Sequence, residues 1–276
     1  MLGKRKETVL AMKTNFNVRK NVPLVHCITN YVTVNDVANA LLACGGSPIM
    51  ADDIGEVSDI TSISNALVIN IGTLNERTVR SMVKAGLTAN EKNIPVILDP
   101  VGAGASSLRN EAVKTLLSQV KFKVIRGNLS EMSFIAGLSV STRGVDSSEA
   151  DSGNDAVSVA KTVADKYGCV AAITGAVDVI TNGNDVAKIS NGVPQMGKIT
   201  GTGCMLSGVI GAYAGANDDT FSAVTDAVAS MGIAGEMAFE RCGSLGTGSL
   251  HIGIIDALSL IDDGIIKEKG KITYEK

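Results

Sequence analysis

The alternation of apolar and polar positions predicts a chain in which strands and helices follow one another. Short apolar runs rich in Val, Ile and Ala recur along the sequence, and polar or periodic stretches separate them. The expected strands are 23–28, 47–51, 66–71, 95–98, 123–125, 169–173, 177–180 and 186–189. The run 66–71 (ALVINI) is almost continuously apolar, which is typical of a parallel strand buried on both faces.

The stretches between these strands have the spacing of amphipathic helices. The first apolar stripe consists of Val34, Val37, Ala38, Leu41 and Leu42. This i, i+3, i+4, i+7 spacing keeps the residues on one helix face, and the pair Gly45-Gly46 then ends the helix. Further helices are expected at 75–91, at 107–119, from about 129, at 154–167, and in three pieces between 202 and about 269. The stretch 139–153, rich in Ser, Gly and Asp, is expected to be a surface loop.

A tight turn late in the series changes the direction of the sheet. The runs 177–180 and 186–189 are separated by Thr181-Asn182-Gly183-Asn184, and an Asn-Gly pair favours a β-hairpin. The earlier strands are joined through helices, which favours parallel pairing. We therefore expect a single α/β domain over residues 1–276, with a mostly parallel central sheet, helices on both faces and an antiparallel hairpin at one edge.

Composition and charge exclude several classes of protein. Apolar residues make up 45% of the chain, aromatic residues only 3%, and there is no Trp. Small apolar side chains suit helices packed closely against a parallel sheet. The net charge of −3 gives no basis for a general affinity for nucleic acid or for anionic lipid.

The sequence shows no targeting or membrane segment of the usual kinds. The residues Met1 to Lys6 are basic, but Lys13 and Asn15 interrupt the apolar stretch that follows, whereas a secretory signal needs an unbroken one. No apolar stretch approaches the ~20 residues of a membrane span. The five cysteines are an odd number without a CxxC pair, which favours reduced thiols. We expect a cytoplasmic protein.

Polar and glycine-rich clusters follow several of the expected strands. In open α/β sheets, ligands bind beyond the carboxyl ends of the strands. The sharpest cluster is Gly201-Thr202-Gly203-Cys204, which opens a long helix. Free backbone N–H groups at a helix start favour an anion, although a short Gly-x-Gly can also be a simple turn into a helix. Neither the Walker pattern nor the Rossmann fingerprint is present.

Acidic and basic candidates lie beyond two other strands. Asp99 and Glu131 could hold Mg²⁺, which takes one or two carboxylates together with waters and phosphate oxygens. Asp99 could instead cap the turn before Pro100, and Glu131 could be a first-turn helix charge. Arg126 could grip a phosphate or lie on the surface. The only two histidines, His26 and His251, are expected to be packing residues.

Taken together, these clusters resemble the ribokinase-like superfamily, and within it the hydroxyethylthiazole kinases of the thiamine pathway. The resemblance extends from about Pro23 to Asp262. The motifs that carry it, in chain order, are PLVHCITNYVTVNDVAN (23–39), SPIMAD (47–52), ILDPVGAG (97–104), IRGNLSE (125–131), AITG (172–175) and GTGCMLSG (201–208). It implies a three-layer α/β/α fold.

The resemblance also implies a reaction and an assembly. The reaction is transfer of phosphate from ATP, with Mg²⁺, to the primary alcohol of 4-methyl-5-(2-hydroxyethyl)thiazole, a step of thiamine salvage. The implied assembly is a homotrimer with active sites at the subunit boundaries.

Roles carry over from the family motif by motif. The resemblance implies that Arg126 and Thr174 bind ATP and that Asp99 and Glu131 belong to the metal and phosphate region. For the thiazole it implies four residues: Met50, Gly201, Asn30 and Val32. It implies that the loop Gly201, Thr202, Gly203 and Cys204 forms an anion hole.

Cys204 departs from the wider superfamily, which usually has Asp at the end of that loop. A thiol there agrees with the thiazole kinase branch. It could act as the general base or as a polar wall of the pocket, and both remain open. Three other readings are a related kinase for a hydroxymethylpyrimidine or a sugar, a non-catalytic sensor, and a dinucleotide-dependent oxidoreductase.

Overall fold

The computed structural model describes residues 13–138 and 149–275, and nine strands form one sheet within them. The strands are β1 (Leu24–Ile28), β2 (Ser47–Ile49), β3 (Ala66–Asn70), β4 (Val96–Asp99), β5 (Val124–Asn128), β6 (Val170–Thr174), β7 (Asp178–Thr181), β8 (Val186–Ile189) and β9 (Ile272–Glu275). Their order across the sheet is β2-β1-β3-β4-β5-β6-β7-β8-β9. All pairs from β2 to β6 are parallel, and the pairs from β6 to β9 are antiparallel.

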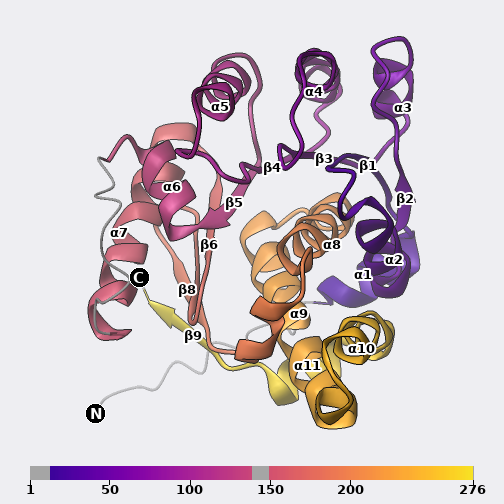
Figure 1. Cartoon of the computed structure of the whole chain (residues 1–276), viewed down its shortest axis with the longest axis vertical. Helices are drawn as coiled ribbons and strands as arrows, with labels where there is room; N and C mark the ends of the chain where they lie inside the picture. The colour runs from indigo at the N-terminus through magenta and orange to yellow at the C-terminus, as the bar shows by residue number, and fades with distance from the viewer. Residues whose placement is uncertain (1–12, 139–148, 276) are drawn as a thin grey trace, which may run out of the picture.

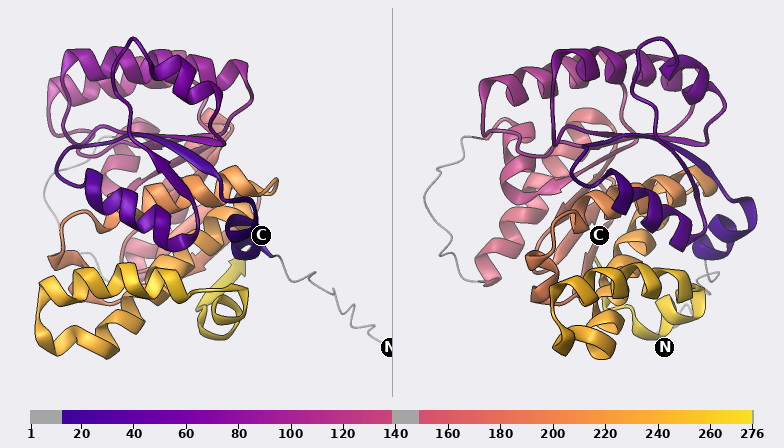
Figure 2. Two further views of the ribbon diagram at one scale, coloured as in Figure 1. Left: turned by 90° about the vertical axis from the view of Figure 1, so that its right-hand side faces the viewer. Right: turned by 45° about the vertical axis from the view of Figure 1, so that its right-hand side comes forward.

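Helices cover both faces of this sheet, as Figure 1 shows. They are α1 (Thr14–Asn21), α2 (Val34–Cys44), α3 (Val57–Ser62), α4 (Glu76–Glu91), α5 (Ser107–Gln119), α6 (Leu129–Ala136), α7 (Glu149–Tyr167), α8 (Thr202–Ala216), α9 (Thr220–Cys242), α10 (Thr247–Leu260) and α11 (Asp263–Lys269). In Figure 2, α10 lies farther from the sheet than α8 and α9 do.

The alternation of side chains along each strand creates two separate hydrophobic cores. On β3, Ala66 and Val68 face the core beneath α1, α2, α8 and α9, whereas Leu67 and Ile69 face the core beneath α4 to α7. Successive strand residues point to opposite faces, so a strand between two helix layers must be apolar at every position. This is why 66–71 has no polar alternation.

Close contact between α8 and the sheet depends on Gly211. A Cβ atom at this position would lie 2.7 Å from Val68 Cγ2 and 2.9 Å from Val25 Cγ1. Real Cβ atoms do not approach carbon that closely, so a larger residue would push α8 away from β1 and β3. The absence of a side chain therefore sets the height of α8, and of the loop at its start, above the strand ends.

The first helix is tied to the C-terminal part of the chain. The backbone N–H groups of Asn15 and Phe16 donate to the Asp263 carboxylate, each at 3.0 Å. These N–H groups belong to the first turn of α1 and have no partner within the helix. A carboxylate at a helix N-terminus also interacts favourably with the helix dipole, so Asp263 caps α1 across a sequence separation of 248 residues.

Most of the expected elements are confirmed, and the differences have local causes. Three elements were not predicted from the sequence pattern: α1, α3 and β9, which are short and have few buried residues. Four helices rather than three occupy the region after 202, and β5 continues to Asn128. The expected loop 139–153 ends earlier, because α7 begins at 149 and adding residues to a formed helix costs little. Positions 139–148 and the basic residues 1–6 lie outside the described residues.

The described helices differ from membrane-spanning helices. Within residues 13–138 and 149–275, none of the helices combines the length and the apolar character required to cross a membrane.

A partly buried carboxylate lies between α9 and α1. Asp226 Oδ2 accepts a hydrogen bond of 2.6 Å from Thr14 Oγ1. Burial raises the pKa of Asp226 to about 6, the Thr14 hydrogen bond lowers it, and Asp263 and Asp219 raise it. Because the folded state holds this proton more tightly than the unfolded chain does, the contribution of Asp226 to stability falls as pH rises from about 4 to about 6.

We predict that Asp226→Asn stabilises the fold at neutral and alkaline pH. The amide carries no charge to bury, so the advantage of the variant over the parent in free energy of unfolding should grow by about 1 kcal/mol between pH 5 and pH 8. Urea denaturation at the two pH values measures it. Asp256→Asn, which removes an exposed carboxylate on α10, controls for net charge. A constant or shrinking difference for Asp226→Asn would contradict the prediction.

Candidate active site

The carboxyl ends of the parallel strands meet the start of α8. β1, β3, β4, β5 and β6 all point their carboxyl ends toward the same edge of the sheet, because each is parallel to its neighbour. α8 crosses the sheet on the face below them and begins close to this edge (Figure 1). The polar residues that follow the strands therefore lie near the glycine loop.

The glycine loop has a conformation that requires glycine at two points. Gly201 has φ of 88°, in the left-handed region, and is the N-cap of α8. A Cβ at Gly203 would lie 2.7 Å from Arg126 Nη1. The missing side chain allows a guanidinium to approach the first turn of the helix. Two sources of positive potential, the helix dipole and Arg126, thus meet at one point and favour an anion there.

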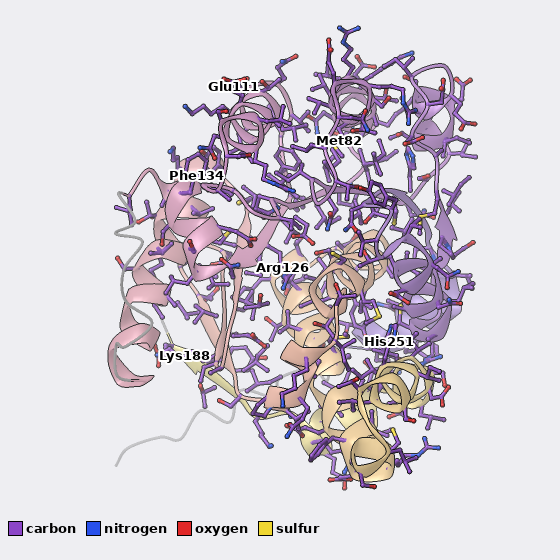
Figure 3. All side chains as sticks on the ribbon, in the orientation of Figure 1. Met82, Glu111, Arg126, Phe134, Lys188 and His251 are labelled. Carbon is purple, nitrogen blue, oxygen red and sulfur yellow. The ribbon has the colours of Figure 1, made fainter. Side chains whose placement is uncertain are left out.

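Arg126 is held at this point by two partners. Its Nη2 donates a 2.6 Å hydrogen bond to Thr174 Oγ1, and its Nη1 lies 3.6 Å from Asp99 Oδ2. The Arg126 side chain is 12% exposed, so the alternative of a surface arginine is wrong. Figure 3 shows Arg126 near the centre of the molecule, between β5 and α8. The structure therefore brings together the two residues that the motifs assign to ATP.

Asp99 is a fully enclosed carboxylate. Its Oδ2 accepts hydrogen bonds from Asn70 Nδ2 at 2.7 Å and from Ser207 Oγ at 2.8 Å. Burial raises the pKa of Asp99, while Arg126 and the hydrogen bond from Ser207 lower it. Its Oδ1 is buried and has no hydrogen-bond partner among the described residues. Asp99 therefore does not act as a simple turn cap, and one of its oxygens has no protein partner among the described residues.

Glu131 joins two loops of the site. Its Oε1 accepts from the backbone N–H of Gly102, and its Oε2 from that of Asn128, each at 2.8 Å. Asn128 Oδ1 accepts in turn from the Glu131 N–H, which completes a capping box at the start of α6. The first-turn helix role is thus present. Among the described residues, no group of three or more His, Cys, Asp and Glu side chains could hold a metal ion by itself.

The half-buried thiol of Cys204 contacts two asparagines. Asn30 Nδ2 lies 3.2 Å from Cys204 Sγ, and Asn70 Nδ2 lies 3.3 Å from it. Asn30 was expected from the motifs, but Asn70 was not. Asn70 is the one strongly polar residue in the run ALVINI, at the carboxyl end of its strand, and that position could have identified it.

A cavity of about 500 Å³ lies on the Arg126 side of the glycine loop. Its wall includes Arg126, Thr174, Asp178, Asn191, Thr202 and Gly203. Asp178 was not expected: its carboxylate accepts from the Gly175 N–H at 2.9 Å, and burial raises its pKa to about 6, against lowering by that hydrogen bond and by Arg126.

The residues expected to bind thiazole do not line this cavity within the described part of one chain. Met50 is half-buried, and Val32 is 56% exposed just after β1. Asn30 reaches Cys204 from the β1 side of the glycine loop, opposite to Arg126. The structure thus brings the nucleotide candidates together, and connects one thiazole candidate to the end of the loop.

The two histidines have different surroundings. His26 is buried, its Nδ1 lies 2.9 Å from Thr61 Oγ1, and its Nε2 lies 2.8 Å from the Ala51 carbonyl. The predicted packing role is confirmed, because these bonds fix the strand end beside Met50. His251 Nε2 lies 3.1 Å from Asp36 Oδ1 on α2, a partner that was not predicted because the two residues are far apart in sequence.

We predict that Gly203→Ala impairs activity without unfolding the protein. The new Cβ must displace the Arg126 guanidinium from the helix start, so kcat/KM should fall at least about 10-fold, as expected when one charged contact to an anionic substrate is lost. The melting temperature should change little. Gly248→Ala, where a Cβ would meet no atom within 4 Å, is the matched control. Equal kinetics in both variants would contradict the prediction.

Comparison with known proteins connects this arrangement to a kinase family. The model of the hydroxyethylthiazole kinase family matches residues 16–263. A hydroxyethylthiazole kinase of Ruminiclostridium cellulolyticum is 59% identical over 256 residues, which cover 92% of this chain and 94% of the relative. The solved structure of a hydroxyethylthiazole kinase from Pyrococcus horikoshii OT3 has a TM-score of 0.87 at 36% identity, over 95% of this chain and 98% of that one.

More distant structures share the fold alone. A ribokinase-like superfamily protein from Enterococcus faecalis V583 has a TM-score of 0.61 at 10% identity, with 88% of each chain covered. The three-layer ribokinase-like fold expected from the motifs is confirmed by these comparisons together with the observed sheet.

Proposed function

The chain belongs to the hydroxyethylthiazole kinase family, and on that premise we propose how its residues divide the work of the reaction. The protein is a kinase that phosphorylates the alcohol of hydroxyethylthiazole, a step of thiamine biosynthesis. The proposal concerns the donor, the metal ion, the role of each site residue and the assembly. The arrangement of Arg126 at the glycine loop is the observation that carries it.

ATP is the phosphate donor in this proposal, and it lies in the cavity beside Arg126 and Thr174. A nucleoside triphosphate needs positive potential for its terminal phosphates and room for its base and sugar. The cavity offers about 500 Å³, with Arg126 and the first turn of α8 at one end. The guanidinium can donate to phosphate oxygens while Thr174 keeps it in place.

Asp99 and Glu131 would hold Mg²⁺ at the phosphate end of this cavity. The free Oδ1 of Asp99 is a hard oxygen ligand, and Mg²⁺ in kinase sites is usually held by one or two carboxylates together with phosphate oxygens and waters. Both Glu131 oxygens accept backbone N–H groups, so Asp99 is the stronger ligand of the two. The cation would supply neutralisation of phosphate charge.

The thiazole alcohol binds on the other side of the loop, near Met50, Asn30 and Val32. Gly201 packs closely against Thr33, which lies in the turn that also carries Asn30 and Val32. The glycine loop and this turn therefore form one surface. Met50 and Cys204 each pack against the hydrophobic core beneath α8. A flat ring with an apolar face fits this environment better than a polyol does.

Transfer itself needs a free electron pair on the alcohol oxygen. That oxygen attacks the γ-phosphorus, the bond between this phosphorus and the bridging oxygen of ADP breaks, and the alcohol proton passes to the thiolate sulfur of Cys204, which becomes a thiol. The N–H groups of the loop Gly201 to Cys204, together with Arg126, stabilise the charge on the transferred group. Because the transition state is loose and needs little help from a base, a thiolate can accept the proton where the superfamily usually has a carboxylate.

The assembly in this proposal is a homotrimer with sites at the subunit boundaries, in the cytoplasm. Tyr31 is 80% exposed and Val32 56% exposed, directly after β1 and beside the glycine loop. Large apolar side chains at the edge of a binding site are typical of a surface that a partner covers. A second copy placed here would enclose the thiazole. Residues 1–276 form one kinase domain in each copy.

We predict that the protein releases ADP when given hydroxyethylthiazole, ATP and Mg²⁺, and that chelation of Mg²⁺ abolishes this. A coupled ADP assay measures the rate, and a panel with a hydroxymethylpyrimidine and a sugar defines the acceptor. ADP release with the sugar but not with the thiazole would overturn the assignment. Nucleotide binding with every alcohol unreactive would favour a sensor.

We also predict distinct effects at Cys204. If Sγ accepts the alcohol proton, Cys204→Ser should lower kcat by about 10²- to 10⁴-fold, whereas Cys204→Asp should retain activity because a carboxylate accepts protons. KM for the thiazole should change less than kcat. A Ser variant within a few-fold of the parent would show that Cys204 is a wall of the pocket rather than the base.

A further inference from the structure

We propose that Asn70 is a positioning residue which, together with Asn30, holds the sulfur of Cys204 as a hydrogen-bond acceptor with one direction left free for the substrate alcohol. The proposal rests on the proposed role of Cys204 as the proton acceptor. Asn70 is not among the described residues that line the cavity, and it is only 1% exposed. Its effect on the reaction would therefore be exerted through Cys204.

The amide of Asn30 has a fixed orientation. Its Oδ1 accepts from the backbone N–H of Thr33 at 3.2 Å and from Thr33 Oγ1 at 3.1 Å. A flipped amide would point its NH₂ group at the Thr33 N–H, donor against donor. The Nδ2 of Asn30 must therefore face the other way, where it reaches Asn70 Oδ1 at 3.0 Å and Cys204 Sγ at 3.2 Å.

The amide of Asn70 is fixed by the same reasoning. Its Oδ1 accepts from the Gly72 N–H at 2.9 Å and from Asn30 Nδ2. Its Nδ2 donates to the buried carboxylate of Asp99 at 2.7 Å and lies 3.3 Å from Cys204 Sγ. A flip would place the amide oxygen against this carboxylate. Each of the two amides thus has one N–H committed to a neighbour and one directed at the sulfur.

Two N–H donors on the sulfur of Cys204 restrict the direction of its remaining S–H bond or lone pair. A thiol sulfur has two lone pairs and one S–H, and a thiolate has three lone pairs. With two positions taken by N–H groups, the third position carries either the proton or a free lone pair. Cys204 is partly exposed, and in this proposal the third position is the one that meets the substrate alcohol. The two asparagines therefore stabilise the anionic sulfur and also aim it.

Asn70 also connects the two halves of the site. Asp99 Oδ2, which orients the Asn70 amide, lies 3.6 Å from the Arg126 guanidinium. Cys204, which faces the alcohol, is thus joined to Arg126, which faces the phosphate. The connection runs through the amide of Asn70 and the carboxylate of Asp99. The sequence offers a matched control, because Ser207 donates to the same Asp99 oxygen but does not contact either asparagine among the described residues.

The test is a double-mutant cycle with Asn70→Ala and Cys204→Ala, and with Ser207→Ala as the matched control. In the parent, Asn70→Ala should lower kcat about 10- to 100-fold, with a smaller change in KM for hydroxyethylthiazole, since a hydrogen bond to a charged group is lost. In the Cys204→Ala background the same change should have less than about a 3-fold effect. Ser207→Ala should have equal effects in both backgrounds.

A second measurement does not depend on turnover. The rate of iodoacetamide alkylation at Cys204 can be followed by mass spectrometry of its peptide, and in the parent this rate should increase with pH. In Asn70→Ala the midpoint of the increase should lie about one pH unit higher. The peptide readout separates Cys204 from Cys242, which is also half-buried. If Asn70→Ala does not fold, Asn70→Ser, which is too short to reach the sulfur, replaces it.

Equal losses of kcat in both backgrounds, with an unchanged alkylation profile, would overturn the proposal and make Asn70 a structural residue only. A fully active Cys204→Ala enzyme would instead overturn the proposed role of Cys204. The alkylation profile would still decide whether Asn70 acts on the sulfur, so the two failures are distinguishable.

Discussion

A carboxylate buried beneath a helix start must find partners, because an unpaired charge in a protein interior costs several kcal/mol. Asp99 satisfies one oxygen with an asparagine, a serine and a guanidinium 3.6 Å away. Each of these partners is thereby fixed: Asn70 on β3, Ser207 on α8 and Arg126 on β5. Three elements that are distant in sequence are held in register by this one group.

The Asp99 carboxylate also requires close packing of the elements around it. Ser207 reaches Asp99 only because α8 lies low over the sheet, and that height depends on Gly211. Gly203, two turns earlier on the same helix, leaves the space that Arg126 occupies. Glycines along one helix thus serve both the core and the site. Small residues are required wherever backbone and side chain approach this closely.

Much of the fold and the nucleotide side of the site could be predicted from sequence. The apolar runs identify the strands, and the rule that ligands bind at their carboxyl ends leads to Asp99, Arg126 and Thr174. Short elements such as α1, α3 and β9 were not predicted, because so few of their residues are buried that the periodicity of apolar positions is weak.

Polar residues that act inside the core were not predicted from the sequence for a different reason. Asn70 lies within an apolar strand and Ser207 within an apolar helix, so neither stands out from its neighbours. Their importance arises from Asp99, which only the folded chain brings near. The pair of Asp36 and His251 likewise joins helices separated by most of the sequence. Residues whose role depends on a distant partner require the three-dimensional structure.

The cap that Asp263 places on α1 bears on how the chain folds during synthesis. α1 is made among the first residues, yet the carboxylate that satisfies its free N–H groups is made 248 positions later. Until then this helix has no cap of its own, since the residue before it forms no side-chain bond. Contacts of such long range slow folding and favour completion after most of the domain has emerged from the ribosome. The capped form of α1 therefore becomes available only after Asp263 has been made, and it then connects the beginning of the described chain to its last helices.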